Sequence, residues 1–381
     1  MDKTKTDNKK NSRDIGQEKT ERKSFLATAA DMWFNFQGVS VREKLVFIQN
    51  LSVMIKAGIP ILSSFRTLAD QTESKTFSRV IKQIALKLEQ GSTLSDALKM
   101  YPRIFNELFV NMIGSGEISG KLEDVLGQLY LQTKKQYELT SRIKGALTYP
   151  IIVVAAMIGI GVFMMVFVIP KITSVFTESN VPLPLFTRIL IDISDFLTNQ
   201  WLISSVAAVI IIFGAWSLLR TERGKYFFQG IILRLPIIGP ITKKVNLARF
   251  SRTAGSLLKT DIMIVNAFKI TANVVSNLHY RKAILEISEQ IKKGGQINEI
   301  IKNYPRFFPP MVTQMITVGE QTGEVTDILA DLAEFYESEV DQIMQNLPSI
   351  IEPVLILLLG LGVGAIAVAV IMPMYSLTST I

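Results

Sequence analysis

The chain has 381 residues, carries a formal net charge of +8 and contains no cysteine. The lack of cysteine excludes disulfide bonds, thiol catalysis and thiolate metal sites. Hydrophobic residues make up 48% of the sequence and the mean hydropathy is +0.31. Because the apolar residues gather in blocks, the composition indicates an integral membrane protein rather than a soluble globule.

Residues 1–39 are predicted to form a disordered or weakly structured basic tail. The first 23 residues hold eight basic and five acidic side chains and almost no apolar ones. They lack the apolar core of a signal peptide, so no cleavage is expected. A basic tail is also compatible with a membrane protein that binds nucleic acid. However, membrane insertion and anionic lipid headgroups already account for basic residues beside membrane helices, so no direct nucleic-acid contact is expected.

Residues 40–147 are predicted to form the first of two cytoplasmic helical bundles. Ser40 and Glu43 fit a capping box, in which each side chain accepts the backbone N–H of the other residue at a helix start. Apolar residues then recur at helical spacing, with breaks at Gly58 and Gly91, and no stretch alternates as a strand does. The pattern indicates an all-α fold with about six helices in this region.

Three apolar segments are predicted to cross the membrane as helices. Each contains a run without charged residues that is long enough for a hydrocarbon core of about 30 Å. The segments are residues 148–170, 201–220 and 348–373. A trans-side loop at 171–200, the second helical bundle at 221–347 and a short trans-side tail at 374–381 complete the chain.

Basic residues flank the predicted spans on one side of the membrane. Arg142 and Lys144 precede the first span, and Arg220, Arg223 and Lys225 follow the second. Because Lys and Arg are enriched in cytoplasmic loops, both large bundles are expected to face the cytoplasm.

The chain contains one pattern twice, since residues 47–177 and 250–380 align at a constant offset of 203 without insertion. Matched glycines and prolines imply duplicated backbone geometry rather than shared composition. If the first and third spans point the same way, the unduplicated helix at 201–220 must return the chain between them.

The motif Gly-Glu-X-Ser/Thr-Gly occurs in both copies, at 116–120 and 319–323. Its structural interpretation is a tight turn between a short helix and a long one, where glycines adopt unusual backbone angles and the glutamate or hydroxyl caps a helix start. Its functional interpretation makes Glu117 and Glu320 contacts for a basic partner surface or a divalent cation. The turn glycines are Gly116, Gly120, Gly319 and Gly323.

Matched prolines and glycines also mark the first and third predicted spans. The prolines are interpreted as boundaries of the membrane helices or as hinges. The glycines are expected to allow close helix packing in the membrane and to form an association face. The prolines are Pro150, Pro170, Pro353 and Pro373, and the glycines are Gly159, Gly161, Gly362 and Gly364.

No catalytic site is predicted. The loop around Gly114 and Gly120 resembles a phosphate-binding loop, but five residues rather than four separate these glycines, and Leu122 replaces the metal-binding Ser/Thr. His279 is the only histidine, so no histidine triad or multi-histidine metal site can be assembled. We expect no enzymatic activity, no cofactor and no metal site built from such residues.

The duplicated domain, the three spans and the paired motifs together resemble the platform proteins of type II secretion and type IV pilus machines, the GspF/PilC family, including its competence pseudopilus members. The paired motifs are the two Gly-Glu motifs and Tyr-Pro-Arg-X-Phe at 101–105 and 304–308. The resemblance spans residues 40–375. It implies a multi-pass protein of the bacterial plasma (inner) membrane.

The resemblance also implies partners. They are a hexameric assembly ATPase, pilin or pseudopilin subunits, other membrane proteins of the assembly machine, the lipid bilayer and further copies of the chain in a homo-oligomer. One departure is Asp261-Ile262-Met263, which stands where the first copy has Gly58-Ile59-Pro60. Gly and Pro predict a helix break in the first copy, and the sequence does not decide whether the second copy has the same break.

The leading hypothesis is a non-enzymatic mechanical adaptor, which couples ATPase-driven motion of the bundles to subunit extraction and filament assembly. The alternative is a membrane transporter built from duplicated halves. No ionisable residue lies within the cores of the three spans, whereas coupled transport usually places such groups there. Pili, secretion pseudopili and DNA-uptake filaments are not distinguished by the sequence.

Overall fold

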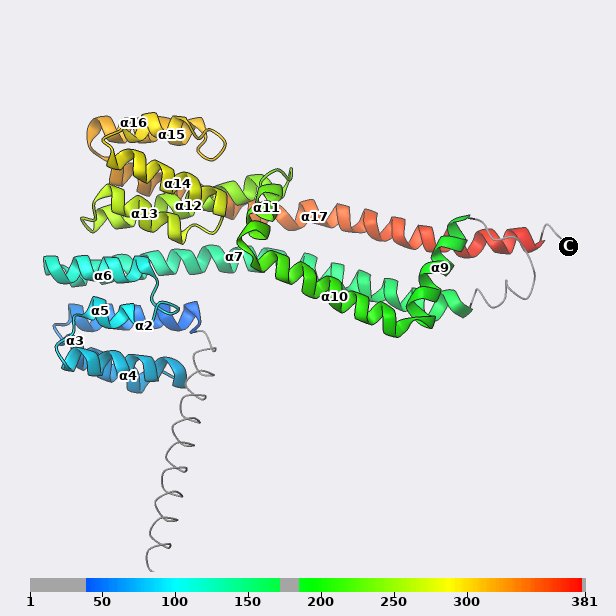
Figure 1. The fold of residues 1–381 in the computed structure, drawn as a ribbon, viewed down its shortest axis with the longest axis horizontal. Helices are drawn as coiled ribbons and strands as arrows, with labels where there is room; N and C mark the ends of the chain where they lie inside the picture. The colour runs from blue at the N-terminus through cyan, green and yellow to red at the C-terminus, as the bar shows by residue number, and fades with distance from the viewer. Residues whose placement is uncertain (1–38, 172–184, 379–381) are drawn as a thin grey trace, which may run out of the picture. The chain divides into compact units, whose positions relative to one another are not determined.

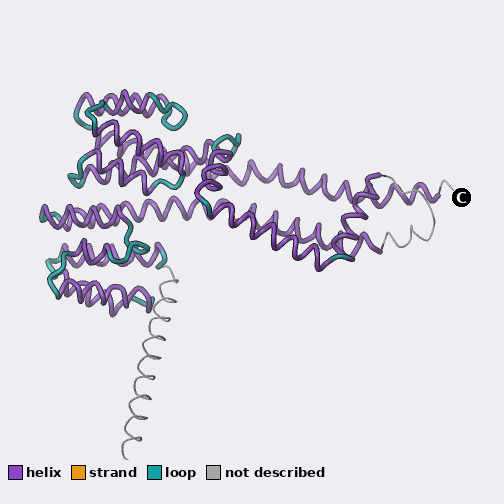
Figure 2. Tube along the Cα trace, viewed as in Figure 1, coloured by secondary structure: helices purple, strands orange, loops and turns teal. Residues whose placement is uncertain are grey.

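The computed structural model of the chain describes residues 39–171 and 185–378. The described residues form α-helices and one short π-helix joined by turns, with no strand among them (Figure 1, Figure 2). They divide into two compact units, residues 39–137 with 256–271, and residues 138–171 and 185–255 with 272–378. The predicted all-α class is confirmed. Most of the predicted N-terminal tail lies outside the described residues.

Side-chain caps begin most helices of the first repeat. The capping box is formed, because Ser40 N–H donates to Glu43 Oε2 at 2.8 Å and Glu43 N–H donates to Ser40 Oγ at 3.1 Å. Ser74, Thr93 and Asn106 cap the next helix starts in the same manner. The helices are α2 (Val41–Lys56), α3 (Ile61–Gln71), α4 (Lys75–Glu89), α5 (Leu94–Lys99), α6 (Glu107–Ser119) and α7 (Leu122–Phe163).

The second repeat contains the same helices in the same order, preceded by the additional helix α11 (Glu222–Ile232). The helices that correspond to α2–α7 are α12 (Ile238–Lys259), α13 (Ile264–Val274), α14 (Leu278–Lys292), α15 (Ile297–Lys302), α16 (Pro310–Thr322) and α17 (Val325–Thr378). The predicted duplication is therefore present in the order of the helices.

Three aromatic rings form the centre of the core in each repeat. In the first repeat, Phe47 lies 5.3 Å from Phe77 and 6.2 Å from Phe105 between ring centroids. In the second, Phe308 lies 5.3 Å from Phe250 and 6.2 Å from Tyr280. All six side chains are buried, and such ring pairs stabilise a core beyond the area that they bury.

The helix break at Asp261 is present, although Asp replaces Gly. Asp261 has a φ of 61°, and Gly58 at the matching position has a φ of 78°. Asp261 N–H donates to Leu258 O, as Gly58 N–H donates to Ile55 O three residues back. Asp is one of the few residues other than Gly that adopts this left-handed conformation at modest cost. The open question from the sequence is thus answered by backbone geometry.

Three helices are long and apolar enough to span a membrane within the described ranges, as predicted, and the chain is a membrane protein. The first is α7 with its extension to Lys171, the second is α10 (Trp201–Arg220), and the third is α17. Both α7 and α17 begin in a helical bundle and continue without a break into the apolar segment.

The matched prolines do not begin these helices. Pro150 lies inside α7, and α17 contains both Pro353 and Pro373. The interpretation of Pro150 and Pro353 as helix starts is therefore wrong, whereas a membrane boundary at Pro373 stays a prediction. An internal proline removes one backbone hydrogen bond, which membrane helices tolerate because neighbouring groups satisfy the freed carbonyl. Their role as hinges stays a prediction.

Pro170 follows a local change of helix type. Residues Met164–Val168 form a π-helix, η1, in which Ile169 N–H donates to Met164 O, five residues back. Such a wider turn moves backbone away from the proline ring, which would otherwise meet the carbonyl four residues earlier. Helix α9 (Leu185–Asn199) packs on η1, and Ser194 Oγ donates to Met165 O at 2.6 Å. Helix α9 was not predicted within the trans-side loop at 171–200.

The matched membrane glycines have open space around them in the described part of the chain. A Cβ atom placed on Gly159, Gly161, Gly362 or Gly364 would meet no neighbouring atom within 4 Å. The association face predicted from these glycines therefore stays a prediction, and its partner would have to come from outside the described chain.

Candidate functional site

The carboxylate of Glu117 holds the start of a neighbouring helix. Glu117 lies in the last turns of α6, and its two carboxylate oxygens accept the backbone N–H groups of Leu94 and Ser95. These are the first two residues of α5, which has only six residues. Free N–H groups at a helix start carry partial positive charge, so a carboxylate there is favourable.

Glu320 makes the same contacts in the second repeat. Its oxygens accept the N–H groups of Ile297 at 2.8 Å and Asn298 at 2.9 Å, at the start of α15. The residue before α15 is Gln296, whose side chain makes no capping hydrogen bond, whereas Thr93 before α5 accepts the N–H of Asp96. Glu320 is therefore the only side chain that the structure shows capping α15.

The glycines of the motif have two different roles. Gly120 and Gly323 end α6 and α16 with φ values of 69° and 79°, a conformation that favours glycine. Gly116 and Gly319 lie within the helices rather than in the turns. A Cβ on Gly116 would come within 2.9 Å of Val125 Cγ2, so the missing side chain lets α6 approach α7 closely. The turn therefore begins only at the last glycine of each motif, and the other motif residues belong to α6 and α16.

A partner or cation contact at Glu117 and Glu320 stays a prediction. Both carboxylates already accept two backbone donors each, as the hydrogen bonds above show. In the described ranges, no group of three or more His, Asp or Glu residues is placed to hold a metal ion.

An acidic stretch of α17 forms ion pairs that the sequence analysis did not identify. The best-formed pair joins Arg252 and Glu337, where Nε and Nη2 donate to the two carboxylate oxygens at 2.8 and 2.9 Å. These side chains are only 17% and 15% exposed, so the pair is largely desolvated. The further pairs are Lys244 with Glu339 and Arg142 with Asp341.

An apolar cluster lies directly beside these ion pairs, where α17 leaves the bundle. Leu139 of α7 and Val340, Met344 and Leu347 of α17 are buried together. Ile241 and Val245 of α12 pack against them. The cluster and the ion pairs tie the bundle end of the third membrane helix to two other helices. A signal was present in the sequence, since the acidic residues at 337, 339 and 341 recur at every second position ahead of the third apolar segment at 348–373.

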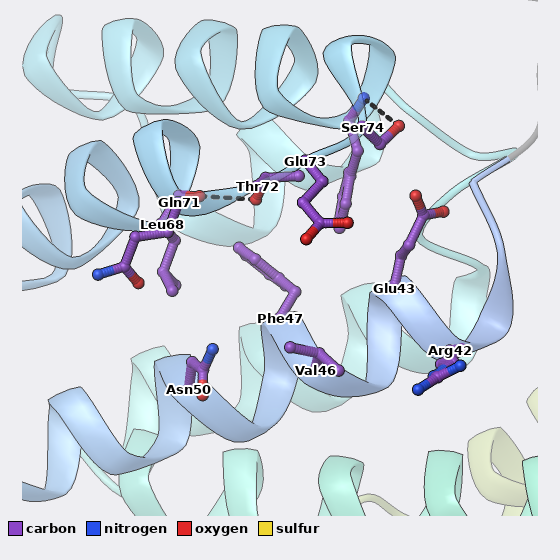
Figure 3. A pocket seen from close by; sticks show the side chains of 11 residues that line it. Arg42, Glu43, Val46, Phe47, Asn50, Leu68, Gln71, Thr72, Glu73 and Ser74 are labelled. Carbon is purple, nitrogen blue, oxygen red and sulfur yellow. Dashed lines mark hydrogen bonds between the residues drawn. The ribbon is translucent and has the colours of Figure 1, made fainter.

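A groove of about 460 Å³ opens in the first repeat between α2 and the turn from α3 to α4. Figure 3 shows Glu43 reaching into it from α2 and Glu73 from the turn, with Phe47 between the helices. Thr72 Oγ1 donates to Leu68 O at 2.6 Å within the wall. The groove therefore has a charged rim and an apolar floor.

A cavity of about 540 Å³ lies at the matching place in the second repeat. Arg249 lines it, donates from Nη1 to Ser276 Oγ, and has a buried Nε that no described group accepts. Burial lowers the pKa of Arg249. The remaining walls are mostly isoleucine, leucine and methionine side chains. His279, the single histidine, lies outside this wall and stacks on Tyr226 with ring centroids 3.8 Å apart.

Comparison with known proteins places this duplicated architecture in one family. The family model described as "Type II secretion system (T2SS), protein F" matches residues 47–170 and again 250–373. The two matches differ by the offset that relates the repeats.

Characterised relatives cover nearly the whole chain. The type IV pilus assembly protein PilC of Myxococcus xanthus is 34% identical over 348 residues, which is 91% of this chain and 83% of that protein. PilC of Thermus thermophilus is 33% identical over 91% of this chain and 85% of that protein. The type II secretion system protein F of Vibrio cholerae is 28% identical over 90% and 84%. The chain therefore belongs to the type II secretion system protein F family, the GspF/PilC-like proteins.

Proposed function

We propose that this protein is a non-enzymatic membrane platform. It couples a cytoplasmic assembly ATPase to the extraction of pilin or pseudopilin subunits and to filament assembly. The relatives that support this proposal are named for type IV pilus assembly and type II secretion. Both bundles face the cytoplasm of a bacterial inner membrane in this proposal, because the basic flanks of the spans favour that side.

The observation that supports mechanical coupling best is the continuity of α17. This helix begins at Val325 inside the bundle and ends at Thr378 beyond the apolar segment. The ion pairs at Glu337, Glu339 and Asp341 fix its first half to α12 and α7. A force that moves the bundle would therefore move the membrane segment, without any chemistry by the platform itself.

The partners in this proposal are a hexameric ATPase, pilin or pseudopilin subunits and other membrane proteins of the machine, and the platform works as a homo-oligomer. Subunits leave the bilayer when the ATPase moves the cytoplasmic bundles. Neither an enzymatic active site nor a cofactor is part of the mechanism.

An insertion in α17 tests the coupling. Seven Gly and Ser residues inserted between Ser349 and Ile350 separate the bundle from the span by a flexible linker. The matched control inserts seven alanines, which add about two helical turns and keep the helix continuous and nearly in phase. We expect the flexible insertion to abolish filament assembly while the ATPase keeps its turnover and the protein still inserts. The alanine insertion is expected to retain assembly.

Intact filaments with the flexible insertion would refute coupling through α17. A deletion strain provides the wider test, because the platform role predicts loss of filaments there, with ATPase turnover unchanged. Filaments in the deletion strain would contradict the proposed function as a whole.

A further inference from the structure

The two hollows described above occupy equivalent positions of the two repeats. Five lining residues of the groove in the first repeat match five lining residues of the cavity in the second at the constant offset. The matched pairs are Arg42 with Val245, Glu43 with Asn246, Val46 with Arg249, Glu73 with Ser276, and Ser74 with Asn277. The same local geometry therefore forms one hollow in each repeat.

In the second repeat, helix α11 lines one side of this place, with Gln229 and Ile232 in the wall. Gln229 of α11 accepts the N–H of Leu278 at 2.7 Å, and its Nε2 lies 3.4 Å from Ser276 O. His279 Nε2 donates a hydrogen bond to the carbonyl oxygen of Tyr226 at 2.9 Å. A Cβ on Gly230 would come within 3.0 Å of the His279 ring, so α11 and α14 approach closely.

In the first repeat, all the described residues that line the groove lie between Arg42 and Phe77, so no helix ahead of α2 takes the place of α11 among them. Phe47 and Phe77 are buried at its floor, but Val46 at its edge is 49% exposed. Two carboxylates, Glu43 and Glu73, and one guanidinium, Arg42, line the groove, so acidic groups are in excess there. An occupant of this groove therefore needs an apolar face with basic residues beside it.

A segment of the chain ahead of the described residues resembles α11 in sequence at several positions. Thr20-Glu21-Arg22 repeats the Thr-Glu-Arg that starts at Thr221, where Thr221 Oγ1 caps α11 by accepting Gly224 N–H at 3.1 Å. Further matches follow at a spacing one residue larger. They are Lys23 with Lys225, Phe25 with Phe227, and Leu26 with Phe228.

The length of the connecting chain also agrees. Leu26 precedes Phe47 by 21 residues, and Phe228 precedes Phe250 by 22. Since α11 reaches its site over the same length of chain, residues 20–31 can reach the groove in the first repeat.

We propose that residues 20–31 of this chain bind in the groove between α2 and the α3–α4 turn, in the place that α11 takes in the second repeat. Phe25 and Leu26 supply the apolar face, and Arg22 and Lys23 supply cations for a rim with two carboxylates. Ala27 is small, and Thr28, which stands where Gly230 does, would meet Thr76 of α4 in place of the larger His279. The inference goes beyond the proposed function and does not depend on it.

Engineered disulfides in the full-length protein test the proposal, because the chain has no cysteine of its own. Thr76 corresponds to His279, and Ser24 corresponds to Tyr226 at the local spacing. Thr76→Cys is combined in turn with cysteine at each position from 23 to 27, and links are identified by mass spectrometry of peptides. The positive control is Tyr226→Cys with His279→Cys, and the tether control is Lys9→Cys with Thr76→Cys.

We expect one position from 23 to 27 to link to residue 76 with a yield close to that of the positive control, and the Lys9 variant to stay near background. If the positive control links and no position exceeds the Lys9 variant, the proposal is wrong. Mixed isotope-labelled and unlabelled chains separate links within one chain from links between copies. Links that form only between copies would overturn docking within the chain.

Hydrogen exchange on two truncated proteins gives an independent measurement. Removal of residues 2–31 is expected to speed exchange of the amides at 41–50 and 72–78 by roughly tenfold, because the groove loses its cover. Removal of residues 2–18 keeps the proposed segment and is expected to leave these amides unchanged. Equal exchange in the two truncated proteins would contradict the proposal, whatever the result of a filament assay.

Discussion

Removal of the Glu320 carboxylate is expected to leave α15 without a side-chain cap, whereas α5 keeps the cap from Thr93 when Glu117 is removed. Each glutamate accepts two backbone N–H groups. A hydrogen bond to a charged group contributes about 1.5 kcal/mol at the lower end of its range, so each Ala variant loses about 3 kcal/mol of local stability. In α5, Thr93 accepts Asp96 N–H at 3.1 Å in the parent protein and in Glu117→Ala alike, so this contribution of about 1 kcal/mol is lost only when Thr93 is also replaced.

Hydrogen exchange of the full-length protein measures these losses directly. An opening free energy lower by about 3 kcal/mol speeds exchange on the order of 100-fold, and one lower by about 4 kcal/mol speeds it on the order of 1000-fold. We therefore expect exchange on the order of 100-fold faster at residues 297–302 in Glu320→Ala and at residues 94–99 in Glu117→Ala, each relative to the parent protein. Glu320→Gln keeps one carbonyl acceptor and should lie between Glu320→Ala and the parent protein.

The double variant Thr93→Ala with Glu117→Ala is the matched control, because it gives α5 the uncapped start that α15 has after loss of Glu320. Its exchange at residues 94–99 should be on the order of 1000-fold faster than in the parent protein, because the loss is about 4 kcal/mol. The reasoning is refuted if Glu320→Ala leaves residues 297–302 protected as before, or if the double variant exchanges no faster at residues 94–99 than Glu117→Ala alone.

Three further changes test packing, charge and ionisation in the second repeat. Gly319→Ala places a Cβ 2.9 Å from Ile328 Cγ1 and should lower the stability of α16 by about 1–2 kcal/mol, measured by hydrogen exchange. Arg252→Met leaves the Glu337 carboxylate desolvated without its main partner and should cost about 3 kcal/mol in the same measurement, most of which Glu337→Met should restore in the double variant. Burial raises the pKa of Tyr280 above its ordinary value of 10.0, so the folded state keeps this hydroxyl protonated. The stabilisation is complete below pH 10 and is lost as pH rises further, so circular dichroism from about pH 9 to about pH 12 should show less alkaline unfolding in Tyr280→Phe than in the parent.

The local signals in the sequence predicted much of this fold. Ser40 and Glu43 form the capping box because the four residues that make it need no distant partner. The membrane helices are equally local, since a long apolar run has few alternatives to a span. The repeat offset then extended each interpretation of the first half to the second.

Features that depend on tertiary contacts or on residue tolerance were not predictable in this way. Pro150 was assigned to a helix start on its usual preference, whereas α7 continues through it. Asp261 left a break undecided because Asp adopts the left-handed conformation far less often than Gly. The roles of Glu117 and Glu320 depend on α5 and α15. Each glutamate accepts the N–H groups of residues 22 and 23 positions earlier in the chain. The pair of Arg252 with Glu337 spans 85 residues, beyond any pattern of local spacing.

The length of α17 has a geometric consequence for how far a small rotation reaches. Its 54 residues extend about 80 Å at ~1.5 Å each, and a bilayer core takes up about 30 Å of that length. At this rise the end at Val325 lies about 50 Å from the middle of the apolar segment at 348–373, so a tilt of about 10° around that point swings the Val325 end by roughly 9 Å. An arm of this proportion converts a modest reorientation among lipids into a displacement of nearly one helix diameter, and equally reduces a large stroke at its tip to a small movement inside the bilayer.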